Sequence, residues 1–266
     1  MTQTVNIVSI FGMVFSLLIS VGLPFVLMAL AKKKMKAKIL PFWIGVGTFL
    51  VFALILEKTI FNYIIISTVG LEKLTSNLWI YALFGGLEAG IFEEVGRYIS
   101  MKFLMKKDLN KENSIMFGIG HGGVEAIIIM GFSMISNLIV ALMINSGTYD
   151  ATLQLLDPAT RAQTLARISV LWTTAPGLFF LGGFERGCAI TCHICFSYVV
   201  YRSLKDRKPL LLLAAIGLHC FMDAGIVLLS STVSEITTEI VFVIFTLVLG
   251  FFTLRSYKNE NDSQIG

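Results

Sequence analysis

Long apolar stretches constrain this chain more than any other feature. Seven mostly apolar segments of about 20 or more residues follow one another along it. A backbone in lipid must satisfy its hydrogen bonds internally, and about 20 apolar residues let a helix cross the hydrocarbon core. The sequence therefore predicts an all-α, polytopic membrane helical bundle with seven transmembrane helices, at about residues 6–31, 40–66, 78–104, 114–145, 170–201, 209–230 and 236–256.

The composition excludes other classes of protein. Hydrophobic residues make up 56% of the chain and charged residues 14%, whereas soluble domains carry about 25% charged residues. The formal net charge of +4 is small and its positive residues are scattered, so we expect no nucleic-acid partner. No segment has the composition of a soluble domain. We therefore expect residues 1–266 to form a single integral-membrane domain in contact with lipid, in a bacterial cytoplasmic membrane, with its oligomeric state left open.

The basic residues predict the orientation of the chain. Fifteen of the 21 Lys and Arg residues follow the first, third, fifth and seventh predicted spans: Lys32, Lys33, Lys34, Lys36, Lys38, Lys102, Lys106, Lys107, Lys111, Arg202, Lys205, Arg207, Lys208, Arg255 and Lys258. Basic loops stay in the cytoplasm, so the N-terminus is predicted to lie outside and the C-terminus inside. The longest loop, 146–169, is then external. Its residues 157–167 are expected to form a short amphipathic helix, either a connector or a lid over the site.

Ionisable side chains inside the predicted spans indicate a functional site, because each costs roughly 2.5–3.5 kcal/mol on insertion scales. All three histidines fall there, with several carboxylates. The histidines and the Glu93–Glu94 pair lie about 7–10 residues from the predicted cytoplasmic ends of four helices, roughly 10–15 Å below the inner surface. We expect these residues to form one layer, and we expect the catalytic residues to be Glu93, Glu94, Arg97, His121, Glu125, Glu185, His193, His219 and Asp223.

The spacing of these residues is consistent with one shared site. His121 and Glu125 are four residues apart, as are His219 and Asp223, so each pair shares a helix face. A buried carboxylate can act as the general base for a water molecule. An imidazole or a protonated carboxyl can stabilise an oxyanion. Together these roles suit hydrolysis of a peptide bond inside or at the edge of the membrane.

Three motifs on separate spans resemble those of the glutamic-type intramembrane proteases, which include the CAAX-processing and bacteriocin-processing enzymes and the PrsW-type proteases. They read Glu93-Glu94-Val95-Gly96-Arg97, Phe117-Gly118-Ile119-Gly120-His121 and His219-Cys220-Phe221-Met222-Asp223. The segments EEVGRY, GHGGVEA and FERGCAITCH are most similar to the YhfC-type branch, over nearly the whole chain.

The resemblance implies a role for each motif. A glutamate of the first motif activates the water, His121 assists, and His219 with Asp223 binds or polarises the scissile carbonyl. The chain departs from the pattern in three places. Arg97 stands where the PrsW-type spacing has Lys, Asp223 stands where the CAAX enzymes often have Asn, and His193 has no counterpart.

We therefore expect an intramembrane endopeptidase, with a glutamate-activated water and histidine-assisted oxyanion stabilisation, that uses no cofactor and cleaves a peptide or membrane-protein substrate. One alternative is a zinc-dependent intramembrane metalloprotease that uses His121, His193 and His219, since three His ligands suit zinc, although H-E-x-x-H is absent. A non-catalytic scaffold and a proton-coupled transporter also stay open, because a carboxylate–histidine layer can relay protons.

Overall fold

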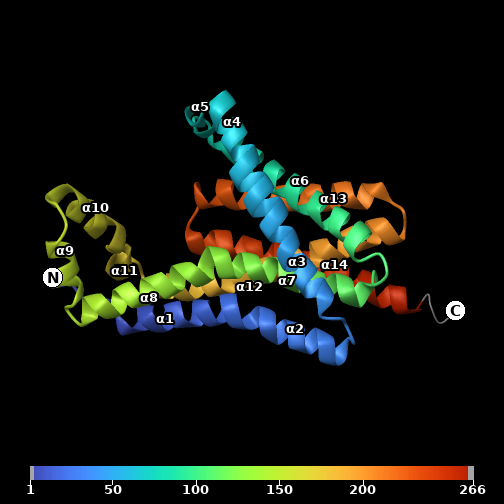
Figure 1. Cartoon of the computed structure of the whole chain (residues 1–266), viewed down its shortest axis with the longest axis horizontal. Coiled ribbons are helices and arrows are strands. Elements are labelled where there is room, and N and C mark those ends of the chain that lie inside the picture. Colours follow the sequence, from blue (N-terminus) through green and yellow to red (C-terminus); the bar gives the residue numbers. More distant parts are fainter. Residues whose placement is uncertain (1–2, 263–266) are drawn as a thin grey trace. The chain divides into compact units, whose positions relative to one another are not determined.

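The computed structural model describes residues 3–262, and every regular element among them is a helix (Figure 1). The all-α prediction is confirmed. In chain order the elements are α1 (Ile7–Leu17), η1 (Leu18–Gly22), α2 (Leu23–Lys34), α3 (Leu40–Thr48), η2 (Phe49–Phe61), α4 (Asn62–Val69), α5 (Leu71–Thr75), α6 (Leu78–Leu104), α7 (Lys111–Ala126), η3 (Ile127–Gly131), α8 (Phe132–Asn145), α9 (Tyr149–Gln154), α10 (Pro158–Ile168), α11 (Val170–Thr173), α12 (Pro176–Lys205), α13 (Pro209–Ser230) and α14 (Glu235–Asp262).

Five helices in the described part of the chain are long and apolar enough to cross a membrane: Ile7–Lys34, Leu40–Val69, Lys111–Asn145, Pro209–Ser230 and Glu235–Glu260. A sixth is added if Pro158–Thr173 and Pro176–Lys205, which meet at a bend of 87°, form one span. The 27-residue helix α6 is not among them, because its charged residues, which include Glu93, Glu94 and Arg97, lower its apolar character. The count of seven spans and their orientation stay predictions.

Three of the long helices contain π-helical segments: η1, η2 and η3. Such segments occur frequently at functional sites and are usually a single turn. The segment η2 has 13 residues and carries two adjacent charged residues, Glu57 and Lys58. An otherwise apolar helix is therefore both irregular and charged at this segment.

Local sequence signals explain where several helices begin. The side chain of Asn77 caps α6 by accepting hydrogen bonds from the backbone N–H groups of Trp79 and Ile80, at 2.8 and 3.3 Å. Such a cap satisfies donors that otherwise have no helical partner. Asp157 caps α10 in the same way, and α10 is the short helix expected around residues 157–167. Pro209 lies in the first turn of α13, where its missing N–H costs nothing.

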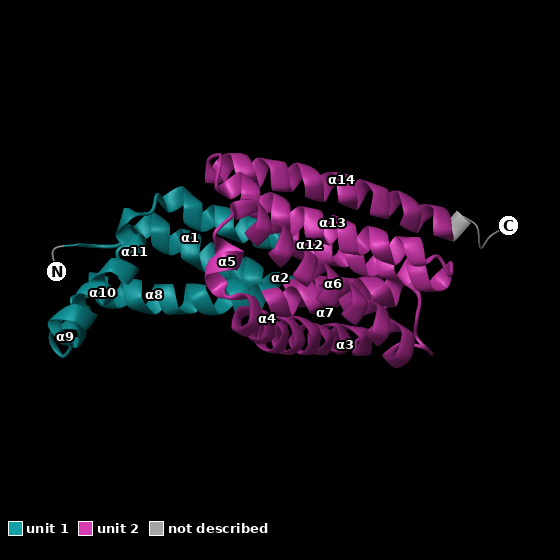
Figure 2. Ribbon diagram, turned by 90° about the horizontal axis from the view of Figure 1, so that it is seen from above, with its two compact units in different colours: residues 1–23, 126–187 teal, residues 24–125, 188–266 magenta. Residues whose placement is uncertain are grey.

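The chain forms two compact units, residues 1–23 with 126–187 and residues 24–125 with 188–266, coloured separately in Figure 2. Their boundaries fall inside helices rather than in loops. The first unit has its own apolar core, in which Met13, Met134 and Leu171 are buried. The side chain of Asn145 bonds both the N–H and the carbonyl of Val5, at 2.7 and 2.9 Å. That the whole chain acts as one domain stays a prediction.

The second unit is organised around α6 and α13, which lie side by side (Figure 2). Two glycines of α6 make this approach possible. A Cβ atom on Gly86 would lie 2.6 Å from the carbonyl oxygen of Cys220, and one on Gly90 would lie 2.7 Å from that of Ile216. Small residues let membrane helices approach this closely. The contact brings the polar face of α6 against that of α13.

Replacing Gly90 by alanine should destabilise the protein, because the new methyl group would collide with backbone atoms that cannot move aside. We expect a cost of about 1–3 kcal/mol, the usual effect of overpacking, measured as a lower midpoint of thermal unfolding in detergent. Gly217→Ala on α13 is the matched control, since a Cβ there has no atom within 4 Å and alanine favours helix. Equal midpoints for the two variants would contradict this explanation of the α6–α13 contact.

Candidate metal centre

Eight of the nine predicted catalytic residues lie in the second unit, on four helices. Helix α6 carries Glu93, Glu94 and Arg97, α7 carries His121 and Glu125, α12 carries His193, and α13 carries His219 and Asp223. The ninth, Glu185, belongs to the first unit, where it pairs with Arg186. The structure therefore brings eight of the predicted residues together within one unit.

Six members of the cluster are buried almost completely. Glu94, Arg97 and His121 are 0% exposed, and the exposed fractions of Glu93, His193 and His219 are 6%, 2% and 1%. Charged groups removed from water must be paired and hydrogen-bonded, because burial without a partner is costly. Each side chain here does contact another member of the cluster.

Arg97 joins both glutamates of α6 to α12. Its Nη1 atom donates to Oε1 of Glu94. Its Nη2 atom lies 3.2 Å from Oε2 of Glu93 and 2.6 Å from Nδ1 of His193. Three and four residues separate Arg97 from the two glutamates, so one helix face presents all three. The guanidinium therefore holds the two carboxylates and one imidazole in fixed positions.

His121 is held by one carboxylate and by aromatic rings. Its Nε2 atom lies 2.9 Å from Oε2 of Glu93. The ring of Phe49 meets it edge-on at 5.4 Å between centroids, and the ring of Phe117 stacks at 6.2 Å. The Nδ1 atom of His121 is buried and has no hydrogen-bond partner within residues 3–262. One nitrogen of this ring thus lacks the partner that a buried polar atom normally has.

His193 faces carboxylates with both ring nitrogens. Its Nδ1 atom is 3.8 Å from Oε2 of Glu93, and its Nε2 atom lies against Oε2 of Glu125. Gly122 makes room for this ring, since a Cβ at Gly122 would lie 2.8 Å from the Cβ of His193. With Nε2 directed at a carboxylate, the lone pair of a neutral imidazole is on Nδ1. Metal binding through Nδ1 would replace the hydrogen bond from Arg97.

His219 lies between two carboxylates. Its Nδ1 atom is 2.7 Å from Oε1 of Glu94, and its Nε2 atom is 3.5 Å from Oδ2 of Asp223. The ring of Phe196 stacks on it at 5.0 Å between centroids and 17° between planes. These contacts fix the plane of the imidazole, while the longer contact leaves Nε2 only weakly bonded.

The donor set of the cluster suits a transition metal. One carboxylate oxygen of Glu93 and one nitrogen each of His121 and His193 all lie within 4.8 Å of one another. Two histidines and a glutamate are a ligand set that catalytic zinc uses, with one position left open. The cluster also contains four carboxylates and one guanidinium, that of Arg97, which pairs with two of them, Glu93 and Glu94. A divalent cation would offset part of this negative charge, so the residues present fit a metal ion such as zinc.

One charged pair near the cluster was not predicted. Glu57 of η2 is 0% exposed, and its Oε1 atom lies 2.5 Å from Nζ of Lys58. Both residues are inside the predicted span 40–66, where adjacent opposite charges are unusual. That departure from an otherwise apolar stretch was the available signal, but neither residue belongs to a motif.

An all-helical chain with several apolar helices and a buried carboxylate–histidine cluster is an integral membrane protein with an enzyme-like site. A family model described as the YhfC intramembrane metalloprotease matches residues 17–246. The chain is also 40% identical over 215 residues to the uncharacterized membrane protein YhfC of Bacillus subtilis (strain 168), across 80% of this chain and 82% of that protein. The chain belongs to the YhfC family of intramembrane metalloproteases, and the resemblance drawn from its motifs is confirmed.

The expectation that no cofactor is used was wrong. The family is described as a metalloprotease, and Glu93, His121 and His193 form a group able to hold a metal. The motifs assigned water activation to one of Glu93 and Glu94, and His193 entered as a metal ligand only in the zinc alternative, since helical spacing does not reveal which helices bring their residues together. The family description supports a peptidase, and it favours the zinc-dependent alternative over the metal-free mechanism.

The assignment of ligands predicts which variants lose metal. Purified Glu93→Gln, His121→Ala and His193→Ala should each retain far less than the about one zinc per chain expected of the wild type, because three ligands hold a catalytic zinc. His219→Ala is the control, since its ring is outside the group of three. Zinc is measured by mass spectrometry of the folded, size-excluded protein. Loss of zinc in His219→Ala with retention in Glu93→Gln would instead indicate three histidine ligands.

Proposed function

We propose that this chain is a zinc-dependent intramembrane endopeptidase that hydrolyses a peptide bond of a peptide or membrane-protein substrate. The observation that carries the proposal is the convergence of Glu93, His121 and His193 within 4.8 Å in a buried site. A buried donor set of this kind is costly to maintain without an ion or a reaction that uses it. Family membership supports peptide hydrolysis as that reaction.

In this proposal Glu94 is the general base. Its Oε1 atom is held by Arg97 and by His219, whereas its Oε2 atom is buried and has no hydrogen-bond partner in the described chain. One oxygen therefore orients the carboxylate, and the other is available to take a proton from water. When bound, the zinc ion supplies Lewis acidity toward the water and the scissile carbonyl.

His219 is the proposed donor to the oxygen of the scissile carbonyl. Its Nδ1 atom is engaged by Glu94, and its Nε2 atom has only the 3.5 Å contact with Asp223. When the ring carries a proton on both nitrogens, Nδ1–H donates to Glu94, and the weakly bonded Nε2–H can donate to the negative charge that develops in the transition state. Asp223 then acts as a positioning residue, and Arg97 positions Glu94 in the same sense.

Cleavage should depend on zinc and on Glu94. Full-length protein in proteoliposomes is incubated with a library of proteome-derived peptides, and the products are identified by mass spectrometry. We expect 1,10-phenanthroline to abolish cleavage and zinc to restore it. Glu94→Gln should lower kcat by about 10²–10⁴-fold, the usual contribution of general acid–base catalysis, while retaining zinc. Glu72→Gln, an exposed change on α5, is the control and should cleave normally.

Two results would contradict this mechanism. Cleavage that survives exhaustive chelation would exclude a zinc-dependent reaction. Full activity of Glu94→Gln would exclude Glu94 as the base, since glutamine cannot accept the proton.

We also infer that seven helices span the membrane, with the N-terminus outside. Helices α6 and α12 are the two predicted spans whose apolar composition alone does not establish them. Their lengths, 27 and 30 residues, are sufficient to cross a membrane. An alkaline phosphatase reporter fused after Asp157 should be active, because phosphatase folds outside the cytoplasm, and one fused after Asp206 should be inactive. The reverse pattern would contradict the orientation.

A further inference from the structure

A cavity of about 350 Å³ in the second unit adjoins the candidate centre. It is lined by residues of η2, α4, α5, α6 and α13. Asp223 belongs to both sites, because its carboxylate contacts His219 and also lines the cavity. A molecule bound in the cavity would therefore touch the same carboxylate that borders the proposed reaction site.

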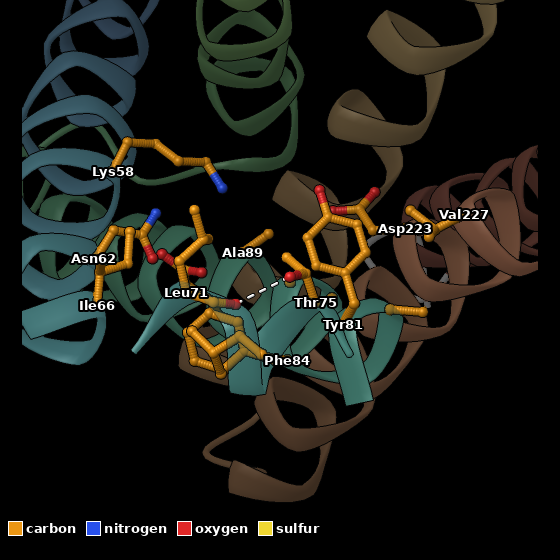
Figure 3. A pocket seen from close by; sticks show the side chains of 15 residues that line it. Lys58, Asn62, Ile66, Leu71, Thr75, Tyr81, Phe84, Ala89, Asp223 and Val227 are labelled. Carbon is orange, nitrogen blue, oxygen red and sulfur yellow. Dashed lines mark hydrogen bonds between the residues drawn. The ribbon is translucent and has the colours of Figure 1, made fainter. Parts of the chain in front are cut away.

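The walls of the cavity differ in character (Figure 3). Lys58 and Asn62 project from one side, and Asp223 and Val227 lie on the opposite side. Leu71, Phe84 and Ala89 add apolar surface. Ligand sites typically combine an apolar lining with a few polar groups and measure about 300–1,000 Å³. This cavity has both properties.

The charges of the cavity favour a cationic ligand. Glu88 lines it, is 5% exposed, and has one carboxylate oxygen, Oε1, without a hydrogen-bond partner among the described residues. The ammonium group of Lys58 already lies 2.5 Å from Glu57. The cavity therefore presents two lining carboxylates, Glu88 and Asp223, against one ammonium that has a carboxylate of its own. A buried carboxylate oxygen that lacks a donor is costly.

We propose that this cavity is a subsite that binds a basic side chain, lysine or arginine, of the peptide that is cleaved at the adjoining centre, with Glu88 as its main partner. The substrate assignment rests on the proposed protease function. The apolar walls suit the methylene stem of such a side chain, while the carboxylates suit its charged end. The shared residue Asp223 explains why the ligand is a segment of the cleaved chain, although the ammonium group of a lipid headgroup has similar chemistry.

Photo-cross-linking tests the subsite without requiring turnover. Each peptide of a series is apolar and membrane-spanning and carries one lysine, whose position shifts along the series. A benzophenone amino acid stands next to the lysine. Each peptide is compared with two versions in which glutamine or acetyl-lysine replaces the lysine. The protein is reconstituted in phosphatidylglycerol vesicles, whose headgroup has no ammonium group. For at least one position, we expect the lysine peptide to label segments 71–89 or 223–227 at least about tenfold more than its neutral counterparts, in line with the strength of charged hydrogen bonds.

The variants separate this inference from the proposed function. Glu88→Gln should lose the lysine preference, whereas Glu72→Gln on α5, which does not line the cavity, should keep it. His121→Ala should also keep it, since this residue lies outside the cavity. Equal labelling by lysine, glutamine and acetyl-lysine peptides of wild-type protein would overturn the subsite, whatever the variants do.

Three further outcomes are decisive. If phosphatidylethanolamine added to the vesicles suppresses the labelling by the lysine peptide, the cavity belongs to a lipid headgroup and the peptide assignment fails. If labelling prefers lysine but the wild type cleaves no peptide of the library, the protease function fails while the cationic subsite stands. If the wild type cleaves peptides of the library but its labelling shows no preference for lysine, the subsite is refuted and the protease function stands.

Discussion

The buried guanidinium of Arg97 is the interaction on which the candidate site depends. It contacts Glu93, Glu94 and His193 and is 0% exposed. Removing one partner of a buried ion pair typically costs about 3–5 kcal/mol, because the remaining charge is left uncompensated. The carboxylates could not be buried together without this cation. A second, exchangeable cation bound by Glu93, His121 and His193 would complete the compensation and supply the chemistry.

Close helix packing brings the members of this charged cluster into contact. Gly86 and Gly90 allow α6 to approach the backbone of α13, and Gly122 allows α7 to approach His193. Those contacts set Glu94 against His219 at 2.7 Å. On the other side of Asp223 the cavity lined by Glu88 begins. The proposed base, the proposed carbonyl donor and the proposed subsite carboxylate Glu88 are thus carried by the same pair of helices, and Asp223 borders both sites.

Much of the fold could be predicted from the sequence, because a chain in lipid has few structures available to it. The helical class, the long helices predicted at about 114–145 and 209–230, and the face that His121 shares with Glu125 follow from apolar length and from a period of about 3.6 residues. The number of spans was harder to predict, since the charged residues of α6 lower its hydropathy. Which helix faces meet could not be predicted, because it depends on contacts between helices that are far apart in the sequence. His193 has no counterpart in the three motifs, and its distance from Glu93 became known only from the structure.

The central claim is that Glu93, His121 and His193 bind one catalytic metal. X-ray absorption at the zinc edge, recorded on the purified full-length protein, tests it most directly. The three-ligand assignment predicts two imidazole nitrogens and a carboxylate oxygen at about 2.0–2.2 Å, with the carboxylate contribution lost in Glu93→Gln. A spectrum with three imidazoles that is unchanged in Glu93→Gln, or protein that cleaves substrate while binding no metal, would contradict it.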